Sequence, residues 1–279
     1  MKPQTSLTKK DVIFTLCCVV FLLVNLAAIG NSGRKRAKEA VCLSNLRQWG
    51  LMFQMYTADN NGFFGTSGSR ANEKWKNWLR PYHSNDPSLL LCPEATISWK
   101  ELGWMGVGDL PPQGAFYAWE DTKKLAPKDV TRFDYWGDIG SYGANSWAVD
   151  AYGIGLERYW KTINVAGADI VPLLLDCTHV GGRPDSMDAP PPFPGIWYGT
   201  PALGTPGWTG PPAMSRFCIN RHDEKVNSLF FDLSARAVGL KELWTLKWYR
   251  TYDQCGQWTT CGGVTPEQWP EWMRGFKDY

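Results

Sequence analysis

Histidine is scarce in this chain, with three in 279 residues, and the charges nearly cancel to a net charge of +2. So few imidazole groups leave little room for a metal centre built from several histidines. A small net charge argues against a protein that binds phosphate backbones, so we expect no nucleic acid partner. The chain also contains no G-x-S-x-G, H-E-x-x-H or phosphate-binding glycine loop, which predicts that it is not an enzyme.

Aromatic and turn-forming residues, by contrast, are abundant, with 16 Trp, 28 Gly and 19 Pro. The hydrophobic content of 44% and the charged content of 20% are those of an ordinary folded protein. This composition excludes a disordered chain, a coiled-coil rod and a polytopic membrane protein. It predicts a globular body of turns and short strands.

One long apolar segment lies near the N-terminus, at 12–30, and its 19 residues include no charged side chain. A helix of this length spans roughly 30 Å, the thickness of the hydrocarbon core. We therefore predict a transmembrane part at 12–30 behind a cytoplasmic leader-like segment at 1–10. A cleaved signal peptide is the alternative, although the run is longer than the usual apolar region of such a peptide.

The segment that follows has the period of one helical face. No proline occurs between positions 34 and 56, and the turn residues 59–62 come next. Apolar side chains recur at spacings of four, three, four and three, at Cys42, Leu46, Trp49, Phe53 and Tyr56. The two segments together predict one helix at 11–58, apolar all round in its first half and amphipathic in its second.

Several short motifs follow one another in a characteristic order. They are Cys42-Leu-Ser-Asn-Leu-Arg-Gln48, Tyr56-Thr-Ala-Asp-Asn-Asn-Gly62, Trp78-Leu-Arg-Pro-Tyr82, Leu91-Cys-Pro93, Ser141-Tyr-Gly-Ala-Asn145, and Arg221-His222 followed by Asp232. With the N-terminal helix, they resemble a bacterial branch of the type IV pilin and type II secretion pseudopilin superfamily. The resemblance implies an α+β, pilin-like fold, in which a long N-terminal helix packs on an antiparallel β-sheet head with long loops.

The resemblance also implies a function. The chain would be a structural subunit of an extracellular pilus or pseudopilus, a homopolymer made by assembly machinery in the inner membrane. Before assembly, one membrane helix would hold each subunit in the lipid. Assembly would involve the carboxylate of Asp11 and the apolar side chains of Val20, Phe21, Leu22 and Leu23.

Two features of the N-terminus depart from the family pattern. Family members are cleaved before the mature helix, which here places the processing site between Ser6 and Leu7. Ser6 replaces the usual Gly or Ala, and Lys9 and Lys10 replace apolar residues, so it stays open whether the leader is removed. Asp11 would pair in the assembly with a neighbour's cation, because a carboxylate that leaves water needs one. Alternatively it is an ordinary acidic residue at a helix start.

The segment 63–279 is expected to form the β-rich head. Core strands are predicted at 170–175 and 226–231, with 235–240 pairing with the second strand as a hairpin. The turn between them places Leu233 where the family has Gly, so we expect a differently shaped turn. Between the core strands, 181–213 contains nine Pro and seven Gly, which predicts a long irregular insertion that contacts neighbouring subunits or faces solvent.

Six of the eight cysteines lie outside the apolar run, an even number that suits disulfides in an exported protein. Six cysteines allow fifteen connectivities. The predicted pairs are Cys255–Cys261, Cys177–Cys218 and Cys42–Cys92. Zinc is the competing interpretation, but the chain has no C-x-x-C, so we predict no metal site.

Other functions are less well supported. Tryptophans three or four residues apart, as in Trp75 and Trp78, would suit a surface glycan-binding adhesin if the rings were exposed. A minor pseudopilin is a further alternative. His222 with Ser215 or Ser228 could form a catalytic pair, but no catalytic motif accompanies them. No cofactor is expected. Some pseudopilins bind calcium, and the carboxylates that could bind it here are those of Asp176, Asp232, Asp185 and Asp188.

Overall fold

The computed structural model describes residues 8–66, 75–83, 86–98, 113–120, 138–151, 155–196 and 212–279, without the side chains at 23, 25–29, 31, 98, 113, 120, 195 and 196. These ranges contain two α-helices, α1 (Lys9–Asp59) and α2 (Trp75–Leu79). Short 3-10 helices connect the strands: η2 (Arg80–Tyr82), η3 (Pro87–Leu90), η6 (Leu156–Arg158), η7 (Ala168–Ile170), η8 (Ala213–Arg216), η9 (Lys241–Thr245), η10 (Pro266–Gln268) and η11 (Glu271–Met273).

A five-stranded sheet with the order β10-β9-β6-β5-β7 forms the centre of the head. Its strands are β5 (Tyr142–Asn145), β6 (Pro172–Asp176), β7 (Gly181–Gly182), β9 (Lys225–Phe230) and β10 (Ala235–Gly239). Two smaller sheets join β1 (Ile97–Ser98), β3 (Tyr117–Glu120) and β4 (Ile139–Gly140), and β2 (Gln113–Gly114) with β8 (Gly195–Ile196).

The predicted core strands are confirmed. The segments 170–175 and 226–231 correspond to β6 and β9, which pair antiparallel, and β10 pairs with β9 as the expected hairpin. The turn of this hairpin, however, does not avoid the left-handed region, because Leu233 has φ 67°. The side chain of Asp232 accepts hydrogen bonds from the backbone and hydroxyl of Ser234, and these bonds hold the turn in a shape that usually calls for glycine.

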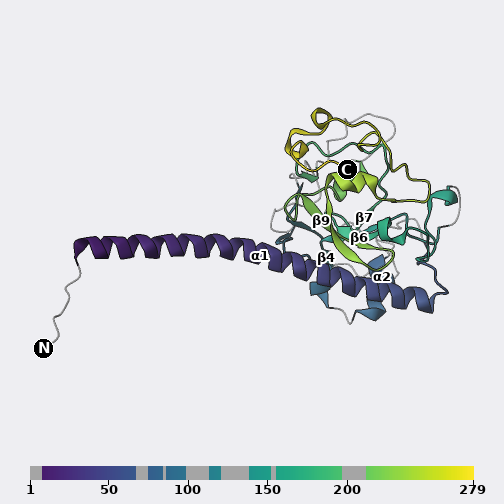
Figure 1. Ribbon diagram of the computed structural model, residues 1–279. Helices are drawn as coiled ribbons and strands as arrows, with labels where there is room; N and C mark the ends of the chain where they lie inside the picture. The colour runs from purple at the N-terminus through teal and green to yellow at the C-terminus, as the bar shows by residue number, and fades with distance from the viewer. Residues whose placement is uncertain are drawn as a thin grey trace, which may run out of the picture.

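Helix α1 packs its C-terminal half against β9 and β10, while its N-terminal half extends away from the head (Figure 1). The predicted apolar stripe is confirmed, because Cys42, Leu46, Trp49 and Phe53 are buried and Tyr56 is half-buried. Each such side chain contributes about 1.5–3 kcal/mol on burial. The stripe therefore fixes the helix to the head.

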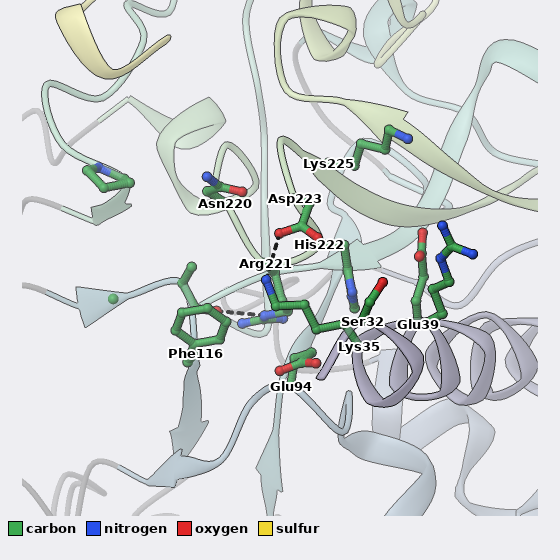
Figure 2. A pocket seen from close by; sticks show the side chains of 14 residues that line it. Ser32, Lys35, Glu39, Glu94, Phe116, Asn220, Arg221, His222, Asp223 and Lys225 are labelled. Atoms are coloured by element: carbon green, nitrogen blue, oxygen red, sulfur yellow. Dashed lines mark hydrogen bonds and ion pairs between the residues drawn. The ribbon is translucent and has the colours of Figure 1, made fainter. Parts of the chain in front are cut away.

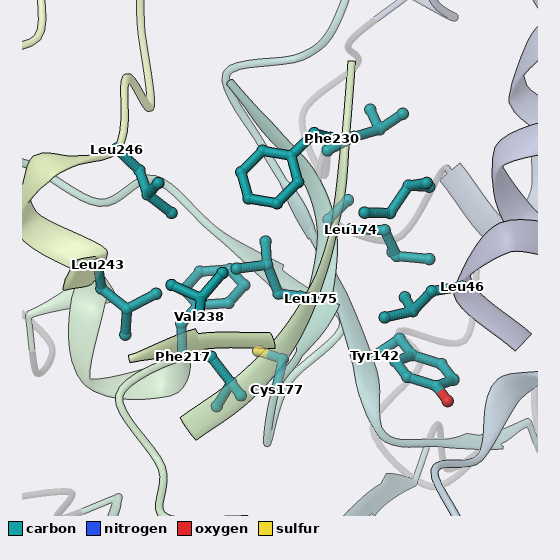
Figure 3. Packing of buried hydrophobic residues seen from close by; sticks show 14 of the residues in the cluster. Leu46, Tyr142, Leu174, Leu175, Cys177, Phe217, Phe230, Val238, Leu243 and Leu246 are labelled. Atoms are coloured by element: carbon teal, nitrogen blue, oxygen red, sulfur yellow. The ribbon is translucent and has the colours of Figure 1, made fainter. Parts of the chain in front are cut away.

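The central sheet is covered on both faces, which explains why β6 is buried along its whole length. Figure 3 shows Leu46 of α1 and Tyr142 on one side of the sheet, and Leu243 and Leu246 on the other. A strand buried on both faces has a continuous apolar run rather than alternation. This is the pattern of Pro172–Asp176.

Two parts of the predicted fold class are wrong. In the described ranges, no helix has the length and the apolar character that a bilayer crossing requires. A helix that crosses a bilayer needs about 20 successive apolar residues. The predicted single-pass inner-membrane localisation is wrong by the same finding. The head is also not purely antiparallel, since β5 pairs with β7, and β1 with β3, in parallel.

The insertion predicted at 181–213 is not wholly irregular. Its first residues form β7, which pairs with β5, and β8 pairs with β2. The part at 197–211 lies outside the described residues. Among the described tryptophans none is exposed: Trp75, Trp244, Trp248 and Trp269 are buried, and Trp78 and Trp272 pack against the core. These rings fill the interior, so they do not form the exposed row that a glycan platform needs.

Candidate functional site

Four side chains from distant parts of the chain meet inside the head. Cys42 lies on α1, Cys92 follows η3, Asp176 ends β6, and His222 precedes β9. All four are buried, and one ligand atom from each lies within 4.8 Å of those of the other three. The stripe of α1 and the central sheet bring these residues together.

The contacts within this Cys42–Cys92–Asp176–His222 cluster converge on few atoms. Cys92 Sγ lies 3.4 Å from His222 Nε2, and Asp176 Oδ2 lies 3.1 Å from the same nitrogen. Cys42 Sγ lies 3.7 Å from both carboxylate oxygens of Asp176. A nucleophile–His–acid triad places its two partners on different ring nitrogens. Here both partners share Nε2, so the geometry is that of converging ligands.

The carboxylate of Asp176 is held in place by its surroundings. Arg221 donates from Nη1 to Oδ1 at 3.0 Å, and the backbone N–H of Asn227 donates to Oδ2 at 2.9 Å. Arg221 also donates to the carbonyl oxygens of Ala115 and Ser141 at 2.7 and 2.8 Å. A buried guanidinium with this many acceptors anchors the carboxylate firmly.

Electrostatic interactions shift the titration of the cluster. Burial raises the pKa of Asp176, but the charges of His222 and Arg221 outweigh burial and hold this pKa well below its ordinary value. Burial lowers the pKa of His222, and the carboxylate of Asp176 reverses this effect and raises the pKa to about 10. Burial also raises the pKa of the Cys92 thiol. Without a metal ion, the cluster therefore contains a charged carboxylate and a protonated thiol at neutral pH.

The backbone after His222 is strained. Asp223 and Glu224 have φ 44° and 67°, although neither is glycine. The N–H of Glu224 donates to Asn220 Oδ1 at 2.7 Å, and the N–H of His222 donates to the carbonyl oxygen of Lys225 at 3.0 Å. Such strain persists only where the surrounding structure fixes the conformation. Here the turn directs His222 into the cluster.

A pocket of about 620 Å³ opens above the cluster, and His222 and Arg221 line its inner side. Figure 2 shows that Lys35 and Glu39 of α1 face this pocket from one side and that Phe116 and Asn220 lie on the other. Of the four residues in the cluster, His222 is therefore the one that solvent in the pocket can approach.

The cysteine pairings are partly wrong. Cys255 and Cys261 form a disulfide, whereas Cys42, Cys92, Cys177 and Cys218 are free and buried. Cys42 and Cys92 face Asp176 and His222 instead of forming a bond with each other.

The predicted Cys177–Cys218 disulfide is absent because the two thiols face different neighbours. Cys177 Sγ accepts a hydrogen bond from the backbone N–H of His179 at 3.3 Å and packs over Gly143. Cys218 Sγ lies 3.9 Å from Met273 Sδ.

The other predicted ligands and catalytic partners are not brought together. Asp232 bonds Ser234 in its turn, and Asp188 accepts hydrogen bonds from the backbone of Asp185 and Met214. Neither lies with Asp176 in the cluster. The candidate nucleophiles are also occupied: Ser215 and Ser228 donate to backbone carbonyl oxygens.

A second candidate functional surface is the N-terminal half of α1. Its exposed apolar side chains are Val12, Ile13, Phe14, Leu16, Val19, Val20, Phe21, Leu22 and Val24. The predicted assembly residues Val20, Phe21 and Leu22 belong to this set; the side chain of Leu23 and the predicted processing site at Ser6 and Leu7 lie outside the described residues.

Asp11 lies in the first turn of α1, where it forms a capping box with the N-cap residue Thr8. Its carboxylate accepts hydrogen bonds from the backbone and hydroxyl of Thr8 at 2.9 and 2.7 Å. These bonds lower the pKa of Asp11. The capping box is a sufficient reason for an acidic residue at this position. A role of Asp11 in assembly stays a proposal.

Each residue of the cluster lies at or beside a feature that the sequence shows separately. Cys42, Cys92 and His222 each occur in a separate motif, and Asp176 directly follows the core strand predicted at 170–175. The prediction of a Cys42–Cys92 disulfide leaves His222 without a relation to either cysteine. Searches against known protein families, curated proteins and solved structures find no match.

Proposed function

We propose that this chain is a structural subunit of a filament of the pilin or pseudopilin kind, assembled through the N-terminal half of α1. The observation that carries the proposal is the exposed apolar surface that nine side chains form between Val12 and Val24, where Phe14 is 72% exposed. Soluble monomers rarely expose an apolar surface of this extent. The order of the sequence motifs supports the same function.

The distribution of this surface around the helix indicates what covers it. At about 100° per residue, the nine exposed apolar positions leave no gap wider than about 80° around α1. A two-helix contact covers one stripe only. A helix that is apolar on every side is buried by several neighbours at once, as in the core of a helical filament formed by further copies of this chain.

The head is built to remain outside such a core. Its interior is closed by its own residues, and Lys35 and Lys38, at the start of its contact with α1, pair with Asp223 and Glu94. These charged side chains lie where α1 meets the head, and they would limit how closely the heads approach the apolar filament axis.

The test is assembly of the full chain after removal of a mild detergent, followed by sedimentation and negative-stain electron microscopy. The wild-type chain is expected to sediment as regular filaments. Val20→Asp places a charge in the core and is expected to leave the chain in the supernatant with a folded head. Phe193→Asp, at an exposed apolar residue of the head, is the matched control and is expected to assemble normally.

Two outcomes would contradict the proposal. One is filament formation by Val20→Asp with the same yield as wild type. The other is a wild-type chain that stays monomeric, or that binds phosphatidylglycerol vesicles as single copies without forming filaments.

A further inference from the structure

We propose that Cys42, Cys92, Asp176 and His222 form a structural zinc site that ties α1 to the head. The four ligands come from α1, from the segment after η3, from the end of β6 and from the turn before β9. This inference is independent of filament assembly. It replaces both the predicted Cys42–Cys92 disulfide and the prediction that the chain has no metal site.

Two of the distances between donor atoms match the edges of a zinc tetrahedron, and a third is slightly shorter. With Zn–S bonds of about 2.3 Å and Zn–N or Zn–O bonds of about 2.0–2.1 Å, tetrahedral ligands lie about 3.3–3.8 Å apart. Cys92 Sγ to His222 Nε2 is 3.4 Å, and Cys42 Sγ to Asp176 is 3.7 Å. His222 Nε2 to Asp176 Oδ2 is 3.1 Å. One ion at the centre would reach all four with small side-chain movements.

The ligand set selects the metal. Two thiolates and an imidazole are soft and borderline ligands, which zinc accepts in tetrahedral structural sites. Calcium and magnesium take oxygen ligands in larger numbers. With four protein ligands the coordination sphere is complete, so the site has no open position for a substrate.

Charge neutrality supports a divalent cation here. Two thiolates and the carboxylate of Asp176 carry three negative charges. The guanidinium of Arg221, which is fully buried against Asp176, and a Zn²⁺ ion carry three positive charges. The buried assembly is then neutral, and this removes most of the cost of taking these charges out of water.

Outer hydrogen bonds already orient three of the ligands. The hydroxyl of Tyr142 lies 3.3 Å from Cys42 Sγ, where it can donate to a thiolate. Asp176 keeps Asn227 and Arg221 as donors, and the backbone N–H of Cys92 donates to Ser141 Oγ at 2.6 Å. Structural metal sites depend on such hydrogen bonds between the ligands and the residues around them. The pocket beside His222 gives the ion a route to the cluster.

The test measures zinc in the full chain, kept in mild detergent and supplied with ZnCl₂ alone. After gel filtration, inductively coupled plasma mass spectrometry is expected to find one Zn²⁺ per wild-type chain. His222→Gln and Cys92→Ser are expected to weaken zinc affinity about 100-fold or more. Cys218→Ser is the matched control, because this thiol is equally buried but faces Met273, and it is expected to retain the ion.

A second measurement needs no variant. Co²⁺ bound by the wild-type chain is expected to show thiolate-to-metal charge transfer and the intense d–d bands of tetrahedral coordination. Circular dichroism verifies that each chain is folded. The proposal is overturned if the folded wild-type chain binds no zinc, if Cys92→Ser binds it as tightly as wild type, or if peptide mapping finds Cys42 and Cys92 joined in a disulfide.

Discussion

Trp49 of α1 donates its indole N–H to the carbonyl oxygen of Leu89 in η3 at 2.7 Å, and no part of the Trp49 side chain is exposed. The ring also packs edge-on against Trp75 and His83. One side chain thus connects the helix to two other elements of the head, and it satisfies a carbonyl group that water does not reach.

Trp49→Phe is expected to lower the free energy of unfolding by about 1–3 kcal/mol. The variant leaves the carbonyl of Leu89 without its donor and leaves a gap where the larger ring was. Urea unfolding followed by circular dichroism measures the change. Leu51→Ala, at an exposed position two residues away, is the control, with an expected change within about 0.5 kcal/mol. Equal effects of the two variants would contradict this account of helix docking.

Gly143→Ala is expected to destabilise the head by about 3 kcal/mol, because the strand has no room for a methyl group. A Cβ atom at Gly143 would lie 2.6 Å from Cys177 Sγ and 2.5 Å from the carbonyl oxygen of His179. The first of these atoms belongs to the short, fully buried side chain of Cys177 and the second to the backbone, so neither can move aside easily. Thermal unfolding provides the measurement, with Gly275→Ala as the control, since a Cβ there meets nothing within 4 Å. A stable Gly143→Ala variant would show that Cys177 and His179, which follow β6, can shift away from β5.

Local periodicity predicted much of this fold. The spacing of Cys42, Leu46, Trp49 and Phe53 defines a buried face without any knowledge of what covers it, and the β9–β10 hairpin follows from two adjacent apolar runs. The expected change of turn shape at Leu233 is wrong, because the preference of one residue for negative φ does not decide the turn alone. The hydrogen bonds between Asp232 and Ser234 stabilise a conformation that the residue itself disfavours.

The candidate site could not be predicted in the same way. Cys42, Cys92, Asp176 and His222 are separated by at least 46 residues along the chain, and only the packing of α1 on the sheet brings them together. Sequence spacing identifies metal sites whose ligands lie in short motifs. It carries no information on ligands that converge through tertiary structure, so the predicted Cys42–Cys92 disulfide is wrong.

Asp11→Asn is expected to reduce the sedimented fraction of the chain in the filament assay, if the carboxylate pairs with a cation of a neighbouring copy. The matched control is Thr8→Ala, which removes the capping hydroxyl and its hydrogen bonds but keeps the charge of Asp11. Loss of the cap costs about 1 kcal/mol of helix stability. Normal assembly of Asp11→Asn would show that this carboxylate acts only as a cap.

His179 gives the head a pH dependence with a definite sign. Burial and the nearby charge of Arg216 lower the pKa of its imidazole to about 3, and its Nδ1 lies 3.2 Å from the carbonyl oxygen of Gly181. In the unfolded chain the pKa is about 6.5. Below pH 6.5 the unfolded chain therefore binds a proton that the folded chain does not, and the free energy of unfolding falls as the pH falls towards 3.

His179→Gln removes this titration, so we expect the loss of stability between pH 7.5 and pH 5 to be smaller in the variant by about 1 kcal/mol. The full shift would give about 2 kcal/mol at pH 5, and solvent around the half-buried ring reduces this value. The measurement is urea unfolding of both chains at the two pH values. Effects of His83 and His222 cancel in the comparison, because both chains contain these residues. An equal pH dependence in the two chains would mean that His179 is already protonated in the folded head at pH 5.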